Sequence, residues 1–231
     1  MEIVDFHAHI LPHMDHGSTR TATGKDQLSL IHQAGVHTVC ATSHFYPQDI
    51  LPAVFLEQRQ ESLQSLLRAY GDHPRPKIIA GAEVLICPGM EEMEGLEALC
   101  PEGSRFLLLE MPFTKQGWDR VLFRTVHEIM QRGIQPVLAH VDRYPAHLIE
   151  SLFEMGLQGQ INASSMMAGL FKPRGLLRWL EEGRIVAFGS DLHGNDPRSY
   201  APFTKLQKQY PDHFASVMEA TTALLKDVKR Y

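Results

Sequence analysis

The amino-acid sequence predicts an α/β fold in which parallel strands and helices alternate to form a β/α barrel. Short apolar segments of strand length alternate with longer segments of helical periodicity, an order typical of parallel strands joined by helices. The apolar segments are almost uninterrupted, as expected of strands that are covered on both faces. Several of them end in a histidine or an acidic residue, which is the arrangement at the active-site rim of a β/α barrel.

Seven strands are expected, and together they suggest a barrel that is one unit short of eight. An open doubly wound sheet remains an alternative. Neither a linker nor a low-complexity segment interrupts residues 1–231, so the chain is expected to be a single domain. The expected strands are residues 2–6, 36–42, 77–84, 105–111, 135–140, 158–162 and 184–190.

Helices are expected between these strands, and glycines mark most of their ends. Pro173 suits the first turn of one helix, because that position needs no backbone N–H. Gly35, Gly133, Gly156 and Gly183 each follow an amphipathic segment, and glycine suits the left-handed residue that ends a helix. The helices are expected at residues 24–34, 52–70, 117–132 and 145–155, from Pro173, and after Pro211.

Composition and charge indicate an ordinary globular protein and exclude some functions. Hydrophobic residues make up 44% of the sequence and charged residues 21%, which is enough for a buried core. A net charge of −5 argues against broad electrostatic binding to nucleic acid, which requires a basic surface. No secretory signal and no membrane span are expected. The three cysteines have no CxxC spacing and fit a reducing compartment, so a cytoplasmic location is expected.

Two pairs of residues with the pattern of metal ligands lie near the two ends of the chain. His7 and His9 form a His-x-His motif, and side chains two apart on a strand point to the same side. Asp191 and His193 follow the last expected strand in the same way. The first and last strands of a barrel are neighbours, so His7, His9 and Asp191 are expected to converge. A chance pair of histidines and an Asx turn beside a solvated histidine are the alternatives, and two matching motifs favour the metal site.

Five further candidate ligands follow the first strand or end the strands between these pairs. Glu83 and Glu110 each follow a buried apolar segment, where a carboxylate is costly unless it is paired or bound to a metal. His44 and His140 occupy equivalent positions, although a single histidine there is as often a satisfied core residue. His16, in the loop after the first strand, is the weakest candidate. Imidazole and carboxylate ligands without thiolate suit Zn, Mn or Fe in a catalytic site, so a metal-dependent hydrolase is expected.

Two arginines follow these motifs at short distances and are candidates for binding phosphate. Arg143 lies three residues after His140, and Arg198 lies five residues after His193. A guanidinium group matches the geometry of phosphate oxygens. A solvated surface arginine is the alternative in both cases.

Seven short motifs occur in order along the chain, at residues 7–12, 41–44, 81–84, 109–112, 138–144, 161–163 and 189–193. Their order resembles the polymerase-and-histidinol-phosphatase (PHP) superfamily over essentially the whole chain. Within it, the chain is similar to the bacterial tyrosine-protein phosphatases encoded with capsular or exopolysaccharide genes. The resemblance implies a distorted seven-stranded, TIM-like β/α barrel and a metal-dependent phosphatase of phosphotyrosine proteins, with a bacterial tyrosine kinase as a candidate partner.

The resemblance also implies three metal ions, commonly Mn, Fe or Zn, and a ligand set for each. Arg143 and Arg198 match the phosphate-binding arginines of the superfamily. The implied ligands are His7, His9, Glu83 and Asp191 for the first ion, Glu83, Glu110 and His140 for the second, and His16, His44 and His193 for the third.

One departure from the family pattern affects the third ion. The tyrosine phosphatases usually have Asp-Asp-Gly in the first loop, and this chain has Asp15, His16 and Gly17. An imidazole therefore replaces a carboxylate, which removes one negative charge and is expected to shift metal preference toward Zn. Smaller departures at Ser43 and at residues 141–142 leave the implied ligands in place.

The expected mechanism is in-line attack on phosphorus by a metal-activated hydroxide, while the ions and arginines neutralise the phosphoryl oxygens. None of the cysteines lies in the Cys-x5-Arg loop of cysteine-dependent tyrosine phosphatases. Three alternatives remain: a PHP phosphatase of a small monoester such as histidinol phosphate, an amidohydrolase-type barrel, and a non-catalytic metal-binding or kinase-docking module.

Overall fold

The computed structural model describes residues 1–113, 120–167 and 174–231. In these residues the chain forms nine β-strands, and every strand runs parallel to its partners. The strands are β1 (Val4–Ala8), β2 (Thr38–Ala41), β3 (His44–Phe45), β4 (Lys77–Ala80), β5 (Glu83–Leu85), β6 (Phe106–Glu110), β7 (Gln135–Leu138), β8 (Gln158–Asn162) and β9 (Ile185–Gly189).

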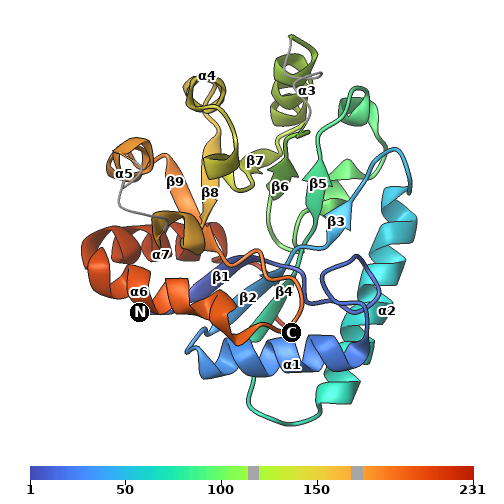
Figure 1. Ribbon diagram of the computed structural model, residues 1–231. Coiled ribbons are helices and arrows are strands. Elements are labelled where there is room, and N and C mark those ends of the chain that lie inside the picture. Colours follow the sequence, from blue (N-terminus) through green and yellow to red (C-terminus); the bar gives the residue numbers. More distant parts are fainter. Residues whose placement is uncertain (114–119, 168–173) are drawn as a thin grey trace.

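The strands form two parallel sheets, which occupy the centre of the molecule (Figure 1). One sheet has the order β1-β2-β4, and the other has the order β3-β5-β6-β7-β8-β9. Backbone hydrogen bonds join the end of β1 to the segment after β9. The N–H of Asp191 donates to the carbonyl of His7 at 2.8 Å, and the N–H of His9 donates to the carbonyl of Leu192 at 3.1 Å. The first and last strands of the chain are therefore neighbours.

The expected count of seven strands is wrong, because one expected strand is divided in two and a further short strand, β3, lies outside the expected segments. The segment expected at 77–84 forms β4 and most of β5, whereas the segment expected at 36–42 forms β2 alone and β3 follows it. The two breaks lie side by side, since the N–H of Gly81 donates to the carbonyl of Ala41 at 2.9 Å. At this level both segments leave the first sheet, which contains β2 and β4, and enter the second, which contains β3 and β5. The strand pairing is therefore split between two sheets and does not close into the single expected barrel.

Seven α-helices are described, and they lie around the outside of the strands (Figure 1). The expected helix at 52–70 is α2, whereas α6 was not expected. The starts of the helices expected from residue 117 and from Pro173 lie outside the described residues. None of the described helices combines the length and apolarity of a membrane span. The α-helices are α1 (Thr21–Gln33), α2 (Pro52–Tyr70), α3 (Arg120–Gln131), α4 (Ala146–Glu154), α5 (Arg174–Glu181), α6 (Ala201–Gln209) and α7 (Pro211–Leu224). Shorter 3₁₀ helices are η1 (Met90–Glu92), η2 (Leu96–Leu99), η3 (Val141–Arg143), η4 (Ala163–Met167) and η5 (Pro197–Tyr200).

Glycines end four of these helices as expected. A residue without a side chain adopts a positive φ angle at little cost, which allows the chain to turn away from the helix axis. The four are Gly35 (φ 78°), Gly133 (φ 78°), Gly156 (φ 97°) and Gly183 (φ 67°).

The two sheets share one apolar interior. Phe6 of β1 and Phe106 of β6 belong to different sheets, yet their buried rings lie 5.1 Å apart. On the outside of β9, Phe188 stacks on Phe214 of α7 at 5.9 Å. Burying a side chain of this size contributes about 1.5–3 kcal/mol each. This packing fixes the strands against one another and therefore fixes the residues at their carboxyl ends.

Candidate metal centre

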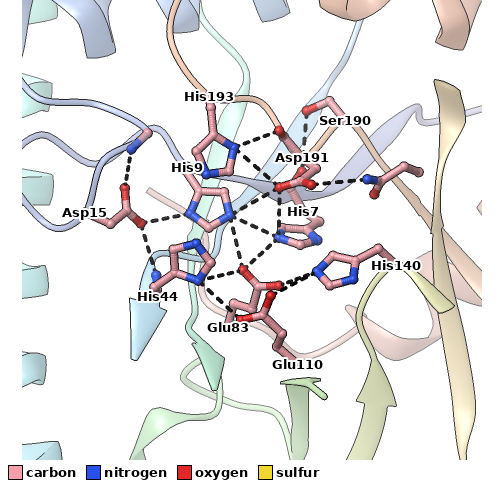
Figure 2. A network of polar contacts seen from close by, with 12 residues as sticks. His7, His9, Asp15, His44, Glu83, Glu110, His140, Ser190, Asp191 and His193 are labelled. Atoms are coloured by element: carbon pink, nitrogen blue, oxygen red, sulfur yellow. Dashed lines mark hydrogen bonds and ion pairs between the residues drawn. The ribbon is translucent and has the colours of Figure 1, made fainter. Parts of the chain in front are cut away.

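Eight of the nine expected ligands point toward one another at the carboxyl ends of the strands (Figure 2). They come from both sheets, since His7 belongs to β1 while Glu83 and Glu110 belong to β5 and β6. Histidines and carboxylates from opposite ends of the sequence thus share one site. The eight residues are His7, His9, His44, Glu83, Glu110, His140, Asp191 and His193.

Four of these side chains form a compact cluster of donor atoms. Nε2 of His7 lies 3.1 Å from Nε2 of His9 and 3.2 Å from Oε2 of Glu83. Nε2 of His9 lies 3.3 Å from the same Glu83 oxygen. Oδ1 of Asp191 lies 3.6 Å and 3.5 Å from the nitrogens of His7 and His9. Donors held at about 2.0–2.1 Å around a tetrahedral ion are about 3.3–3.4 Å apart. The five separations given above are close to that value, and the donor atoms of His7, His9 and Asp191 all lie within 4.8 Å of one another.

Glu83 and Glu110 both lie between His44 and His140. Oε1 of Glu83 is 2.9 Å from Nε2 of His140, and Oε2 is 3.1 Å from Nδ1 of His44. Glu110 repeats this arrangement at 3.5 Å from His140 and 3.7 Å from His44. Glu83 therefore belongs both to the four-donor cluster and to this second group.

The structure groups His44 differently from the set that the resemblance implied. Its ring nitrogen faces the two carboxylates, and donor atoms of His9, His44 and His193 also lie within 4.8 Å of one another. The exposed His16 stacks on His193 at 4.5 Å and on His44 at 5.3 Å between ring centroids. His16 belongs to none of the sets of three close donor atoms that the described residues form.

Gly17 allows the loop that carries His16 to approach β1. A Cβ atom at this position would lie 2.2 Å from Cβ of His9, closer than any real contact of this kind. A side chain at Gly17 would therefore push the loop away from the donor cluster.

The donor set fits divalent metal ions by its chemistry and by its unpaired atoms. Three ring nitrogens and one carboxylate oxygen are buried and make no hydrogen bond of good geometry among the described residues, although two of them, His44 Nδ1 and Glu83 Oε2, form an ion pair at 3.1 Å. Burying a polar atom without a partner costs free energy, and a bound cation would remove that cost. Imidazole and carboxylate groups are ligands that Zn, Mn and Fe accept. The four atoms are His44 Nδ1, Glu83 Oε2, His140 Nδ1 and His193 Nε2.

Gln160 of β8 contacts two of the donor residues, His7 and His140, on the side away from the donor cluster. Its side-chain oxygen accepts a hydrogen bond from the backbone N–H of His140 at 2.8 Å and lies 3.1 Å from Nδ1 of His7. Its amide nitrogen donates to Asn162, and Asn162 in turn donates to Asp191. One polar chain along β8 therefore connects three donors of the centre.

Asp15 has a comparable role on the other side of the centre. Oδ2 of Asp15 lies 2.8 Å from Nδ1 of His9 and accepts a hydrogen bond from the backbone N–H of His44 at 3.0 Å. Its other oxygen accepts from the N–H of Gly17 at 2.8 Å. When a carboxylate occupies Nδ1, the opposite nitrogen Nε2 of His9 remains available to a metal.

The pKa values show which forms the donors take without an ion. Burial alone would lower the pKa of His140, but hydrogen bonds with Glu110 and Glu83 raise it to about 9. Burial likewise opposes a charge on His9, and Asp15, Asp191 and Glu83 nevertheless raise its pKa well above the usual value. Burial raises the pKa of Glu83. The charge of His7 and the hydrogen bonds of His140 and His44 outweigh this effect and hold the pKa well below its usual range. Protonated imidazoles therefore balance ionised carboxylates, and a metal ion would displace those protons.

Two donors sit on unusual backbone conformations. His140 has a φ angle of 32° and Asp191 one of 53°, in the left-handed region that non-glycine residues seldom adopt. Each lies two residues beyond the end of a strand, His140 after β7 and Asp191 after β9. Such strain costs on the order of 1–3 kcal/mol and is concentrated at functional sites.

The two expected phosphate-binding arginines are placed differently. Arg143 donates from Nη2 to Oδ2 of Asp191, and it lines a cavity of about 710 Å³ in front of the donors. Arg198 instead pairs with Asp196 at 2.8 Å, and 89% of its side chain is exposed. Arg198 does not line the cavity, so the structure brings only Arg143 to the site.

The residues that support the donors were missed by sequence reasoning. Gln160 and Asp15 were not expected at the site, although Gln160 is a polar residue within a buried strand. Asp5 was also missed. Fully buried in β1, it accepts hydrogen bonds from the hydroxyls of Ser190 and Tyr200, each at 2.6 Å. A buried polar side chain in an apolar strand was the signal that could have identified Gln160 and Asp5.

Comparison with known proteins gives a consistent family. A family model described as capsular polysaccharide synthesis, CpsB/CapC, matches residues 3–219. The chain is 27% identical over 219 residues to the tyrosine-protein phosphatase CpsB of Streptococcus pneumoniae, with 85% of each chain covered. It is 26% identical over 211 residues to the tyrosine-protein phosphatase YwqE of Bacillus subtilis (strain 168), covering 86% of this chain and 80% of the relative.

A solved structure shows the same fold. It comes from a crystallographic study of YwqE from Bacillus subtilis and CpsB from Streptococcus pneumoniae, described as metal-dependent tyrosine phosphatases. It matches with a TM-score of 0.77 and 24% identity, over 99% of this chain and 97% of the other. At this identity the match shows the fold alone.

Proposed function

Because the chain belongs to the CpsB/CapC family of capsular polysaccharide synthesis, we propose that it is a metal-dependent protein-tyrosine phosphatase. The observation that supports this most is the cluster of donors from His7, His9, Glu83 and Asp191, whose measured separations of 3.1–3.6 Å suit ligands of a metal ion. The names of the relatives point the same way. Open sites of mixed histidine and carboxylate ligands are usually catalytic, and here the cluster faces a cavity.

Three ions of the Mn, Fe or Zn type are proposed, with residues 1–231 as one catalytic domain. When bound, such ions stabilise negative charge on phosphoryl oxygens and lower the pKa of water toward about 7. The buried side chains behind the donors would keep the ligand nitrogens in place. The proposed ligands are His7, His9, Glu83 and Asp191 for one ion, Glu83, Glu110 and His140 for a second, and His16, His44 and His193 for a third.

Arg143 is proposed to bind the phosphoryl group. Its guanidinium lines the cavity and is held by Asp191, so it is oriented before substrate arrives. A contribution from Arg198 would require its side chain to leave Asp196.

The proposed reaction cleaves the bond between phosphorus and the phenolic oxygen of phosphotyrosine. Water supplies the oxygen that ends in inorganic phosphate, and a proton from water ends on the phenol. A phenol with a pKa of about 10 leaves more readily than the hydroxyl of serine.

The proposed substrate is a phosphotyrosine protein of capsular or exopolysaccharide synthesis, and a bacterial tyrosine kinase is the proposed partner. A cytoplasmic location is proposed because Cys40, Cys87 and Cys100 are all buried and unpaired. Free thiols of this kind are typical of reducing compartments.

Turnover of competing substrates tests this function. The metal-loaded protein would be assayed with a phosphotyrosine peptide, its phosphoserine counterpart, histidinol phosphate and nucleotide monophosphates. We expect the highest kcat/KM for the phosphotyrosine peptide. A higher value for histidinol phosphate would favour the small-monoester alternative instead. Glu83→Gln, which alters the residue shared between the two donor groups, should lose turnover of every substrate.

A further inference from the structure

The mouth of the cavity has an apolar rim that the metal chemistry does not use. Beside the donors, the cavity is lined by Tyr46, Leu85, Pro112 and Phe113. Phe113 is 61% exposed and Tyr46 is 37% exposed. Large apolar side chains grouped at a cavity mouth mark binding surfaces more often than accidental exposure.

Each aromatic ring of this rim stacks on an imidazole of the metal centre. Tyr46 lies 5.5 Å from the ring of His44 with an interplanar angle of 17°. Phe113 lies 6.1 Å from the ring of His140 with an angle of 16°. Tyr144 stacks on Phe113 at 5.8 Å, so the orientation of Phe113 is supported from the side. The two rings therefore lie against imidazoles that carry donors of the centre.

The two aromatic rings flank the centre on opposite sides of Glu83. One oxygen of Glu83 faces His44, and the other faces His140. Since Tyr46 stacks on the first imidazole and Phe113 on the second, the carboxylate lies between the two stacked pairs. A phosphoryl group drawn to these donors and to Arg143 would leave its ester substituent at the mouth, beside both rings.

We propose that Tyr46 and Phe113 bind the aromatic ring of an aryl phosphate and so select aryl over alkyl monoesters. The inference rests on the proposed phosphatase function and assigns substrate selection to these two residues. Contact between aromatic rings stabilises a complex by more than the burial of apolar area alone, whereas a short alkyl group has no such additional contribution. The charged end of the substrate meets the polar part of the cavity, and its apolar end meets the rim.

Binding of two phosphonates isolates this contribution from catalysis. Phenylphosphonate and methylphosphonate carry the same charged group on a P–C bond that hydrolysis does not cleave. Calorimetry on the metal-loaded protein would give the Kd of each compound for wild type, Phe113→Ala and Tyr46→Ala. Leu51→Ala is the matched control, because Leu51 is 67% exposed but lies outside the cavity.

We expect each alanine variant to raise the Kd of phenylphosphonate about 5- to 10-fold and to change that of methylphosphonate less than about 2-fold. Phe113→Tyr should keep the preference, and Leu51→Ala should not alter it. Phe113→Leu keeps apolar bulk against His140 without the ring, so it should also reduce the preference. An unchanged ratio of the two Kd values in Phe113→Leu and both alanine variants would overturn the inference.

A separate measurement distinguishes failure of the inference from failure of the proposed function. Wild type could turn over phosphotyrosine peptide while the ratio of the two phosphonate Kd values stays the same in the Tyr46 and Phe113 variants. In that case only the inference about these two residues is wrong. If the Kd ratio changes in the Tyr46 and Phe113 variants but no phosphate ester is turned over, the proposed phosphatase function is wrong and the aryl-binding role of the two residues is supported.

Discussion

Gln160 lies 3.1 Å from His7, through its side-chain oxygen and Nδ1 of the imidazole. The same oxygen accepts a hydrogen bond from the backbone N–H of His140, so it acts as an acceptor toward both residues. Nδ1 of His7 therefore carries the proton, and Nε2 is left to face His9, Glu83 and Asp191. A neutral amide buried in β8 thus sets the tautomer of a metal ligand.

Replacing Gln160 should weaken metal binding without removing a ligand. Gln160→Leu is expected to reduce affinity for Zn or Mn about 10- to 100-fold, because His7 loses the group that orients it. Competition with a chelator of known affinity measures this directly. Gln158→Leu is the control, since Gln158 lies on the same strand and its side chain bonds only to Gln135 among the described contacts. Equal affinities in the two variants would show that the tautomer is fixed by another group.

The first loop gives a test of whether His16 is a ligand. His16→Ala should lose one ion per chain, whereas His13→Ala should lose none, because only His16 stacks on the histidines of the centre. His16→Asp should recover the ion and favour Mn over Zn, since oxygen ligands suit the harder cation. Mass spectrometry of the native protein counts the ions. An unchanged count in His16→Ala would mean that the set seen in the structure, His9, His44 and His193, is sufficient.

The metal-free protein should lose stability as pH rises. The folded pKa of His140 is raised from its usual 6.5 to about 9, so its protonated form stabilises the fold fully below pH 6.5. That contribution, at most about 3 kcal/mol, should disappear between pH 6.5 and about 9. Urea unfolding of the metal-free protein measures it, with His140→Ala as the reference that lacks the group. Parallel pH profiles for the two proteins would contradict the pairing of His140 with Glu83 and Glu110.

The two arginines should differ in their effect on turnover. Arg143→Ala is expected to lower kcat/KM for a phosphotyrosine peptide about 10- to 100-fold, the value of a hydrogen bond to a charged group. Arg198→Ala should have a smaller effect, because that side chain is solvent-exposed and paired with Asp196. Metal content should be unchanged in both variants. A larger loss in Arg198→Ala would mean that the segment around η5 moves toward the cavity when substrate binds.

The sequence allowed the donors to be identified more readily than their grouping. His7, Glu83 and Asp191 could be found because parallel strands align their carboxyl ends, so a polar residue after an apolar segment has a known position. The imidazole of His44 points toward the carboxylates because of its side-chain rotamer and because the strand is broken between β2 and β3. No periodicity in the sequence encodes these features.

The break in the strand expected at 77–84 and the additional strand β3 were also not predictable from the sequence pattern. Residues 36–42 and 77–84 are largely apolar or small and show no turn signal stronger than Gly81. The bends are produced where neighbouring chains pass together from one sheet to the other, which is a tertiary effect. Gln160 was missed for a related reason, since a buried glutamine becomes informative only when its partners are known.

Turnover measured against bound metal tests the proposed function most directly. The protein would be stripped by a chelator, its metal content verified, and hydrolysis of a phosphotyrosine peptide followed as Mn or Zn is added back. We expect no turnover in the stripped protein and full recovery when about two to three ions are bound per chain, as mixed histidine and carboxylate sites require. Full turnover by protein verified to be metal-free would contradict the proposed function.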